Sequence, residues 1–336
     1  MENLKVSVLI TTYNLEKYIR QTLDSVLMQK TNFSHEVLVG DDGSTDGTIE
    51  IIKEYQSRYP EKIKLFVMPR ESGKEYNRVE RSAANRLNLL EKATGEYCCF
   101  LDGDDYYLDE TKLQRQVDVL EKEENQDCVM CAHNLFLTYE TGEKVLLCKA
   151  KKERKITLQQ YWPLMFLQAN AILFRNIYRQ NQPTGILAKS FDDNNITFWL
   201  FQHGKMYYLP QPMGAYRQVS GSSWNAIDEI QKASSNVLGY SVELSVSKEH
   251  RNLSVIRHYP DFRSLYENRT KISKEACMPF YQTAKENHVQ EALWFYEFDE
   301  EDAAMEKKFE SLLRRAKRGY FIAKCKRAFL KVFRLY

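Results

Sequence analysis

The sequence predicts an α/β protein whose mostly parallel sheet is flanked by helices. Two consecutive strand–helix pairs carry this prediction. An apolar strand at residues 6–10 precedes a helix from residue 16 to about residue 29, and a strand at residues 36–40 precedes a helix at 49–55. Each of these strands ends in polar residues. Ligands of open α/β sheets bind beyond the carboxyl ends of the strands, so this pattern favours a nucleotide-binding half-domain.

A third apolar strand, at residues 97–101, ends in three carboxylates packed around a glycine: Asp102, Asp104 and Asp105. Burying carboxylates costs several kcal/mol unless something pairs with them, and three of them together repel one another. A divalent cation is the obvious partner, and oxygen-only ligands suit Mg²⁺ or Mn²⁺, which also bind phosphates. The alternative is a surface turn of Asp and Gly after an ordinary strand.

Composition is consistent with a folded globular chain rather than a disordered or nucleic-acid-binding one. The 336 residues are enough for one large domain and an appendage, with 43% hydrophobic residues and a net charge of +2. No apolar run reaches the length of a membrane span, so we expect a cytoplasmic protein. Nucleic acid is not expected as a partner, because no recognition motif accompanies the basic residues.

The C-terminal part of the chain divides into two predicted segments. Residues 221–310 alternate helical patterns with polar breaks and predict a helical appendage. Residues 311–336 contain no acid, and five residues there share one helix face: Phe321, Cys325, Phe329, Val332 and Tyr336. This pattern predicts a basic amphipathic helix on an anionic membrane, at the inner face of the cell membrane. A solvated basic tail and a nucleic-acid patch are the alternatives.

Four segments together resemble a known family. They read VSVLITTYNLEKYIRQTLDSVLMQ, EVLVGDDGSTDGT, ATGEYCCFLDGDDYYLDETKLQRQ and FDDNNITFWLFQHGKMYYLPQPMGAYRQVSGSSW. In this order they are similar to the conserved blocks of family 2 glycosyltransferases, which have the Rossmann-like GT-A fold. The resemblance implies a glycosyltransferase domain over residues 1–220. Its nucleotide-sugar half would cover about 1–110, and its acceptor half about 111–220.

The resemblance also implies roles for single residues in the nucleotide-sugar half. Thr11 and Tyr13 would line the nucleoside, and Asp42 would accept a hydrogen bond from the uracil ring. Arg81 lies where some members place a basic residue near the pyrophosphate. In the third segment, Asp102 would lie towards the ribose, whereas Asp104 and Asp105 would bind the metal, Mg²⁺ or Mn²⁺.

The expected catalytic base is Asp193. The family usually has Glu-Asp before a helix that ends at a glycine, and this chain has Asp192-Asp193 instead. Counting back from Gly204 places Asp193 on the family's base, with Asp192 as the fallback if the register differs by one. Without that function, the two aspartates would be a helix N-cap pair.

The implied activity is an inverting, metal-assisted transfer of a hexosyl group from a nucleotide sugar, favoured as UDP-linked. The acceptor would be a saccharide, possibly polyprenyl-linked, as in bacterial members that build surface polysaccharides. One alternative is a nucleotide-sugar-binding scaffold without turnover. Another is a phosphatase of the haloacid-dehalogenase type, but its Asp-x-Asp motif normally follows the first strand, which here ends in Thr-Thr-Tyr-Asn.

Overall fold

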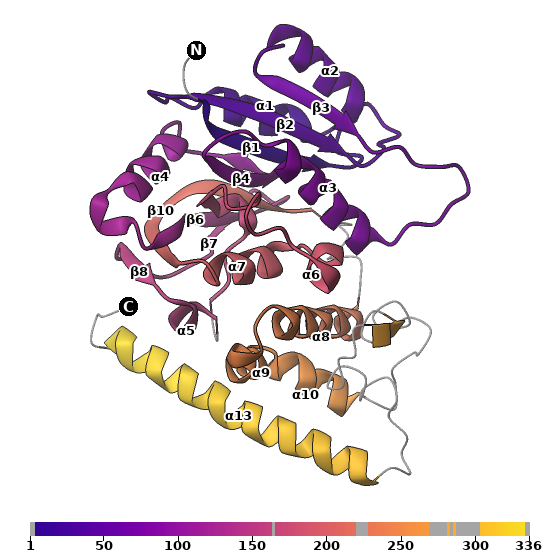
Figure 1. Cartoon of the computed structure of the whole chain (residues 1–336), viewed down its shortest axis with the longest axis vertical. Helices are drawn as coiled ribbons and strands as arrows, with labels where there is room; N and C mark the ends of the chain where they lie inside the picture. The colour runs from indigo at the N-terminus through magenta and orange to yellow at the C-terminus, as the bar shows by residue number, and fades with distance from the viewer. Residues whose placement is uncertain are drawn as a thin grey trace. The chain divides into compact units, whose positions relative to one another are not determined.

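The computed structural model describes residues 4–162, 165–219, 228–268, 281–282, 285–286 and 303–332 (Figure 1). The chain forms two compact units. The first contains Met1–Thr157 and Leu167–Gln218, and the second contains Leu158–Phe166 and Val219–Tyr336. The boundary at residue 218 lies close to the expected residue 220, but the sequence did not predict that residues 158–166 would join the second unit.

The first unit is built on a ten-stranded sheet with the strand order β3-β2-β1-β4-β9-β6-β10-β5, with β7 paired to β6 and β8 to β10. The strands are β1 (Leu4–Thr12), β2 (Ser34–Asp41), β3 (Ile63–Val67), β4 (Tyr97–Asp102), β5 (Tyr106–Tyr107), β6 (Cys128–Tyr139), β7 (Lys144–Leu146), β8 (Arg154–Ile156), β9 (Ile172–Arg175) and β10 (Lys205–Gln218).

The sheet is parallel in its first half and mixed in its second half. Strands β3, β2, β1 and β4 run parallel. Strand β9 then runs antiparallel to both β4 and β6, while β10 is parallel to β6. The predicted α/β class, with helices flanking a central sheet, is therefore confirmed, and the reversed strand β9 makes the sheet mixed beyond β4.

Helices of the first unit pack their apolar stripes against this sheet. They are α1 (Ile19–Leu27), α2 (Thr48–Arg58), α3 (Arg78–Lys92), α4 (Lys112–Glu121), α6 (Gly185–Lys189) and α7 (Asp193–Phe201), with short 3₁₀ turns at Glu123–Asn125 and Ala169–Ala171. Val8, Val39 and Leu101 from the strands and Leu23 and Ile52 from the helices are fully or almost fully buried in one core cluster. Burying such a side chain contributes about 1.5–3 kcal/mol, which holds the strand ends in place.

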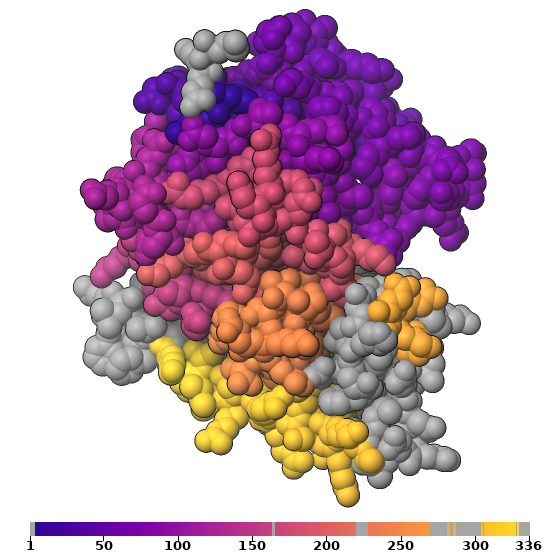
Figure 2. Space-filling view, in the orientation of Figure 1, coloured from indigo at the N-terminus to yellow at the C-terminus, as the bar shows by residue number. Residues whose placement is uncertain are grey.

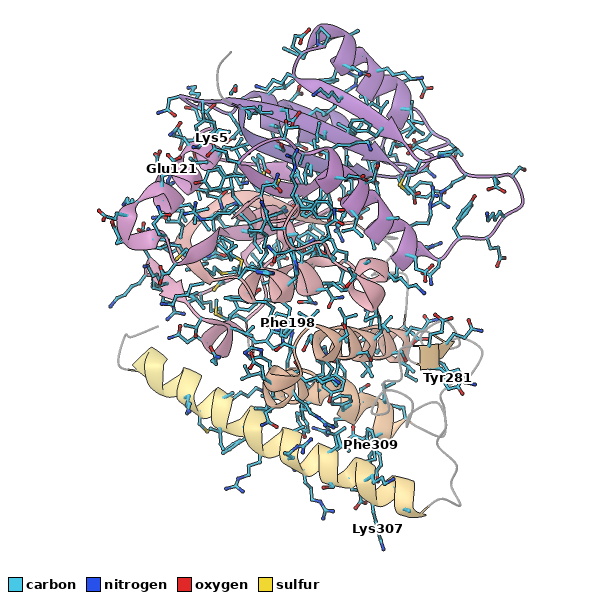
Figure 3. All side chains as sticks on the ribbon, in the orientation of Figure 1. Lys5, Glu121, Phe198, Tyr281, Lys307 and Phe309 are labelled. Atoms are coloured by element: carbon cyan, nitrogen blue, oxygen red, sulfur yellow. The ribbon has the colours of Figure 1, made fainter. Side chains whose placement is uncertain are left out.

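The second unit is helical where the structure describes it. Its elements are α5 (Leu158–Tyr161), α8 (Glu229–Val246), a 3₁₀ turn (Lys248–His250), α9 (Arg251–Arg257), α10 (Tyr259–Glu267) and α13 (Ala303–Val332). Helix α8 begins with a capping box between Asp228 and Gln231. Phe309 is buried and stacks on Tyr266 with 5.4 Å between ring centroids, and Figure 3 shows it pointing to α10 while Lys307 points away.

Helix α13 contains the predicted C-terminal helix but is longer. It begins at Ala303 and runs beside α9 and α10 (Figure 1). Leu312 and Ala316 are buried in the core of the unit, whereas Phe321 and Ile322 are 67% and 45% exposed. The expected helix face continues through Phe329 and Val332, whose side chains lie outside the described set, and Tyr336 lies beyond the described residues. None of the helices described is both long enough and apolar enough to span a bilayer.

Candidate functional site

The carboxyl ends of β1, β2 and β4 bring the predicted polar residues to one edge of the sheet. Thr11 pairs in register with Gly40 of β2 and with Asp102 of β4. The Thr11 hydroxyl donates a hydrogen bond of 2.7 Å to Asp102 Oδ1. The backbone N–H of Gly103 donates to Thr11 O, and a Cβ at this glycine would lie only 3.0 Å from Thr12 side-chain atoms. A side chain at position 103 would therefore crowd Thr12 where the Asp102–Asp105 loop approaches β1.

Asp42 lies in a cluster of arginines and an aromatic ring. Arg81 Nε donates to Asp42 Oδ1 over 2.6 Å, and Arg70 pairs with the other carboxylate oxygen. The Arg70 guanidinium in turn stacks 4.2 Å from the ring centroid of Tyr13, which is 42% exposed. The result is a rigid, partly exposed platform of one aromatic ring beside a clamped carboxylate.

Arg70 was not predicted, because no motif marks it. Arg81 was predicted from the resemblance, but near a pyrophosphate. The structure places it against Asp42 and the carbonyl of Met68, so it shares the position of the residue expected at the nucleobase.

Asp104 and Asp105 are adjacent in sequence but differ in environment. Asp105 is fully buried, and its two oxygens accept hydrogen bonds from Asn170 Nδ2 (2.7 Å) and from the backbone N–H of Arg217 (2.8 Å). Among the residues described, no cation pairs with the carboxylate of Asp104. Desolvation and the nearby charge of Asp102 raise the pKa of Asp104 to about 6. A cation bound beside Asp104 would lower this pKa and stabilise the ionised carboxylate.

Arg217 of β10 contacts the loop that carries Asp104 and Asp105. Its Nε donates to the carbonyl oxygen of Asp104 over 2.7 Å, and its Nη2 donates to Gln21. The guanidinium also stacks on Tyr18 and Tyr106, with the ring centroids 4.8 and 4.9 Å away. Strand β10 therefore fixes the carboxylate loop that follows β4.

Asp192 and Asp193, the fallback and the expected catalytic base, lie in different environments. Asp192 is the N-cap of α7, and its Oδ1 accepts from the backbone N–H of Asn195 over 2.9 Å. Asp193 instead faces Arg86, whose Nη2 lies 3.2 Å from Asp193 Oδ1. Burial raises the pKa of Asp193 to about 7, although Arg86 acts in the opposite direction. A carboxylate with a pKa near neutrality is suited to proton transfer.

Arg86 is a further residue of the site that sequence reasoning missed. The same Nη2 lies 3.2 Å from Asp102 Oδ1, and Nη1 donates to the carbonyl of Phe191. Arg86 is buried on the apolar stripe of α3, in line with Ala83 and Leu90. A cation at a core-facing helix position was the available signal, because such a charge must be paired.

The described residues contain no group of three or more His, Cys, Asp or Glu side chains arranged to hold a metal. The carboxylates that follow β4 nevertheless fit a Mg²⁺-type ion. Such an ion is commonly held by one or two carboxylates together with the phosphates of a substrate. Asp104, with Asp102 beside it, offers such a partial ligand set. Asp105, the other predicted metal ligand, accepts one hydrogen bond at each of its carboxylate oxygens.

The family can be stated at this point. Residues 7–180 match the model of glycosyl transferase family 2, and the chain belongs to that family. The uncharacterized protein Mb1547 of Mycobacterium bovis is 30% identical over 233 residues, which are 66% of this chain and 61% of the relative. The putative glycosyltransferase EpsE of Bacillus subtilis is 36% identical over 126 residues, covering 37% of this chain and 41% of EpsE. The chain thus spans about three fifths of the length of the mycobacterial relative.

Structural similarity agrees with this assignment. Staphylococcus aureus TarS, residues 1–349, solved in complex with UDP-GlcNAc, superimposes with a TM-score of 0.61 and 18% identity, covering 95% of this chain and 90% of that one. By sequence, the TarS poly(ribitol-phosphate) β-N-acetylglucosaminyltransferase is 40% identical over 111 residues, 32% of this chain and 18% of TarS. The likeness confirms the GT-A fold.

Proposed function

We propose that this protein transfers a hexosyl group from a UDP-sugar to a hydroxyl of a saccharide acceptor, with inversion at the anomeric carbon. The observation that carries the proposal is the Arg86 bridge, which joins Asp102 of the nucleotide half to Asp193 of the acceptor half. Family membership and the UDP-GlcNAc complex of TarS support the class of donor.

The nucleoside end of the donor would bind at the Asp42 platform. The Asp42 carboxylate can accept a hydrogen bond from the uracil N–H. Tyr13 presents a ring face on which a base can stack. Arg70 and Arg81 hold Asp42 in place, so we assign Arg81 to the nucleobase end rather than to the pyrophosphate. Thr11 and Asp102, joined by a hydrogen bond, would line the ribose.

A divalent cation, Mg²⁺ or Mn²⁺, would bind at Asp104 with Asp102 nearby. When bound, it supplies Lewis-acid stabilisation of the negative charge that develops on the leaving diphosphate. We assign Asp105 to holding the loop rather than to the metal, because Asn170 and Arg217 already occupy its oxygens.

Asp193 would be the base. The acceptor hydroxyl loses its proton to Asp193 as its oxygen bonds to the anomeric carbon, while the bond from that carbon to the diphosphate oxygen breaks. The products are the extended saccharide and a nucleoside diphosphate. A single base opposite the leaving group implies one in-line displacement, and therefore inversion. Asp192, as the N-cap of α7, is less suited to this role.

The acceptor and its location are also part of the proposal. The relatives include the poly(ribitol-phosphate) β-N-acetylglucosaminyltransferase TarS and the putative teichuronic acid biosynthesis glycosyltransferase TuaG of Bacillus subtilis. A polyprenyl-linked saccharide at the inner face of the membrane would suit such a pathway, with the end of α13 as the contact. The cut that tests this must follow Tyr320, because Leu312 and Ala316 are buried in the core of the second unit. Removal of residues 321–336 should weaken vesicle binding while sparing donor hydrolysis.

The test of the activity is release of UDP from a panel of UDP-sugars with Mn²⁺. The wild-type chain should release UDP from one donor, and excess EDTA or Asp104→Asn should abolish this release. Asp118→Asn is the matched control, because Asp118 is exposed on α4, away from the site. Equal activity of Asp104→Asn and Asp118→Asn would contradict the metal assignment. UDP binding without turnover of any donor or acceptor would instead identify a scaffold.

A further inference from the structure

The second unit contains a pocket that the proposed transfer reaction does not use. It has a volume of about 510 Å³ and lies between α10 and α13. Its five cationic lining residues are Arg263, Arg314, Lys317, Arg318 and Lys324. All five are exposed to solvent, and an anion that enters the pocket would be attracted by several positive charges at once.

Among the residues that the structure describes, two of these cations have an acidic partner. Arg263 Nε lies 2.7 Å from Glu267, and Arg314 lies 3.7 Å from Glu310. In the part of the chain that the structure describes, no acidic side chain pairs with Lys317, Arg318 or Lys324. The sequence has no acid after Glu310. The pocket therefore carries an excess of about three positive charges.

Packing of α13 gives the pocket a defined wall. Gly319 lets α13 approach α9 closely, because a Cβ there would lie 2.5 Å from Ile256 Cγ1. The neighbouring Tyr320 ring packs against Tyr259 of α10, with 5.3 Å between centroids. Lys324 Nζ lies 4.7 Å from the centroid of the Tyr320 ring, which fixes this cation at the rim of the pocket.

We propose that this pocket binds the phosphate headgroup of an anionic membrane lipid. Phosphate is the anion that clustered Arg and Lys side chains recognise. The lipid is favoured over a free phosphate because Phe321, which lines the pocket, and Ile322 beside it are 67% and 45% exposed. Apolar side chains beside a basic cluster can enter the headgroup region of a bilayer. In Figure 2, α13 (yellow) presents side chains on the surface of this unit.

The inference rests on the membrane placement proposed above, but not on the transfer step. The inference differs from the membrane placement in one respect. It assigns the membrane contact to a defined binding site instead of a diffuse electrostatic attraction of the basic tail. These two modes of binding differ in one testable respect. A diffuse attraction depends on net charge alone, whereas a site depends on which charges are removed.

The experiment compares two triple variants of the full chain with equal net charge. The pocket variant is Lys317→Gln/Arg318→Gln/Lys324→Gln. The control is Lys307→Gln/Lys308→Gln/Lys326→Gln, three exposed lysines of the same helix outside the pocket. Partitioning is measured on vesicles of phosphatidylglycerol and of phosphatidylcholine, with thermal unfolding to verify that both variants fold.

The wild type should prefer phosphatidylglycerol, and excess inorganic phosphate at constant ionic strength should displace little of it. A diffuse attraction would cost both variants alike, on the order of 100-fold at about 5-fold per charge near a surface. The defined site predicts that the pocket variant loses more affinity than this and the control less. Equal losses in the two variants, no lipid preference, or full displacement by inorganic phosphate would each overturn the proposal. UDP release, measured on the same samples, reports on the transfer activity separately. Its absence with lipid binding intact would refute the proposed function and leave this site standing.

Discussion

Removing the charge of Arg86 should shift the pH dependence of the reaction, because Arg86 lies 3.2 Å from the expected base. The wild-type base has a pKa of about 7, held down by Arg86 against the effect of burial. In Arg86→Gln the carboxylate keeps its burial and the charge of Asp102 but loses the cation. Its pKa must therefore rise, and the ionised base will be scarcer at neutral pH.

The size of the shift follows from the distance. Two unit charges 3.2 Å apart at an effective dielectric of 20 interact by about 5 kcal/mol, which sets an upper limit of about 4 pH units. Partial exposure of the Asp193 side chain, at 17%, screens this interaction. We therefore expect a rise of about 1–3 pH units, the range found for carboxylates beside a cation.

The assay is kcat/KM for donor turnover as a function of pH, because this quantity reports the pKa values of the free enzyme. Wild type should gain activity through pH 7, and Arg86→Gln should gain it only at a pH about 1–3 units higher. Arg86→Lys, which keeps the charge, should lie between them. Arg81→Gln on the same helix is the matched control, since Arg81 pairs with Asp42 and should affect donor binding only. An unshifted profile in Arg86→Gln would refute the assignment of Asp193 as the titrating base.

Three further predictions concern other sites. Asp42→Ala should weaken UDP binding in calorimetry by about 1–3 kcal/mol, the cost of a lost charged hydrogen bond, and unchanged affinity would remove Asp42 from the nucleoside pocket. Asp105→Asn should lower the free energy of unfolding by about 1–3 kcal/mol, because its amide opposes the Asn170 amide; a fully stable variant would argue that the buried contacts are dispensable. His258 pairs with Glu243 over 2.8 Å, and although burial lowers its pKa, the neighbouring carboxylates raise it overall to about 9. The stabilisation by protonated His258 should be complete below about pH 6.5 and lost as pH rises to about 9. In His258→Gln the melting temperature should no longer fall over this pH range.

The parts of the fold that the sequence predicted are those encoded locally. Strands β1, β2 and β4 appear as short apolar runs, and the polar residues that follow them lie at one sheet edge because parallel strands share a direction. The sequence also offered an N-cap at Asp192-Asp193, and the structure shows that Asp192 is the residue that caps α7.

Features that depend on distant contacts could not be predicted. Arg86 is one of several basic residues on α3 until folding brings it to Asp193, which is 107 residues away in sequence. Residues 158–166 join the second unit because Trp162 Nε1 donates to Glu243, which is 81 residues distant. The hydrogen bonds that Asp105 accepts come from Asn170 and Arg217, which lie 65 and 112 residues away in sequence, so no local pattern could reveal them.

The most direct test of the account is the anomeric configuration and metal dependence of the product formed by the purified full-length chain. A UDP-sugar identified from the panel is supplied with Mn²⁺ and a saccharide acceptor, and the product is followed by NMR from its first turnover. The account predicts release of UDP and a glycosidic bond of inverted configuration, with both lost in Asp193→Asn and donor binding retained. Retained configuration, or a fully active Asp193→Asn variant, would contradict it.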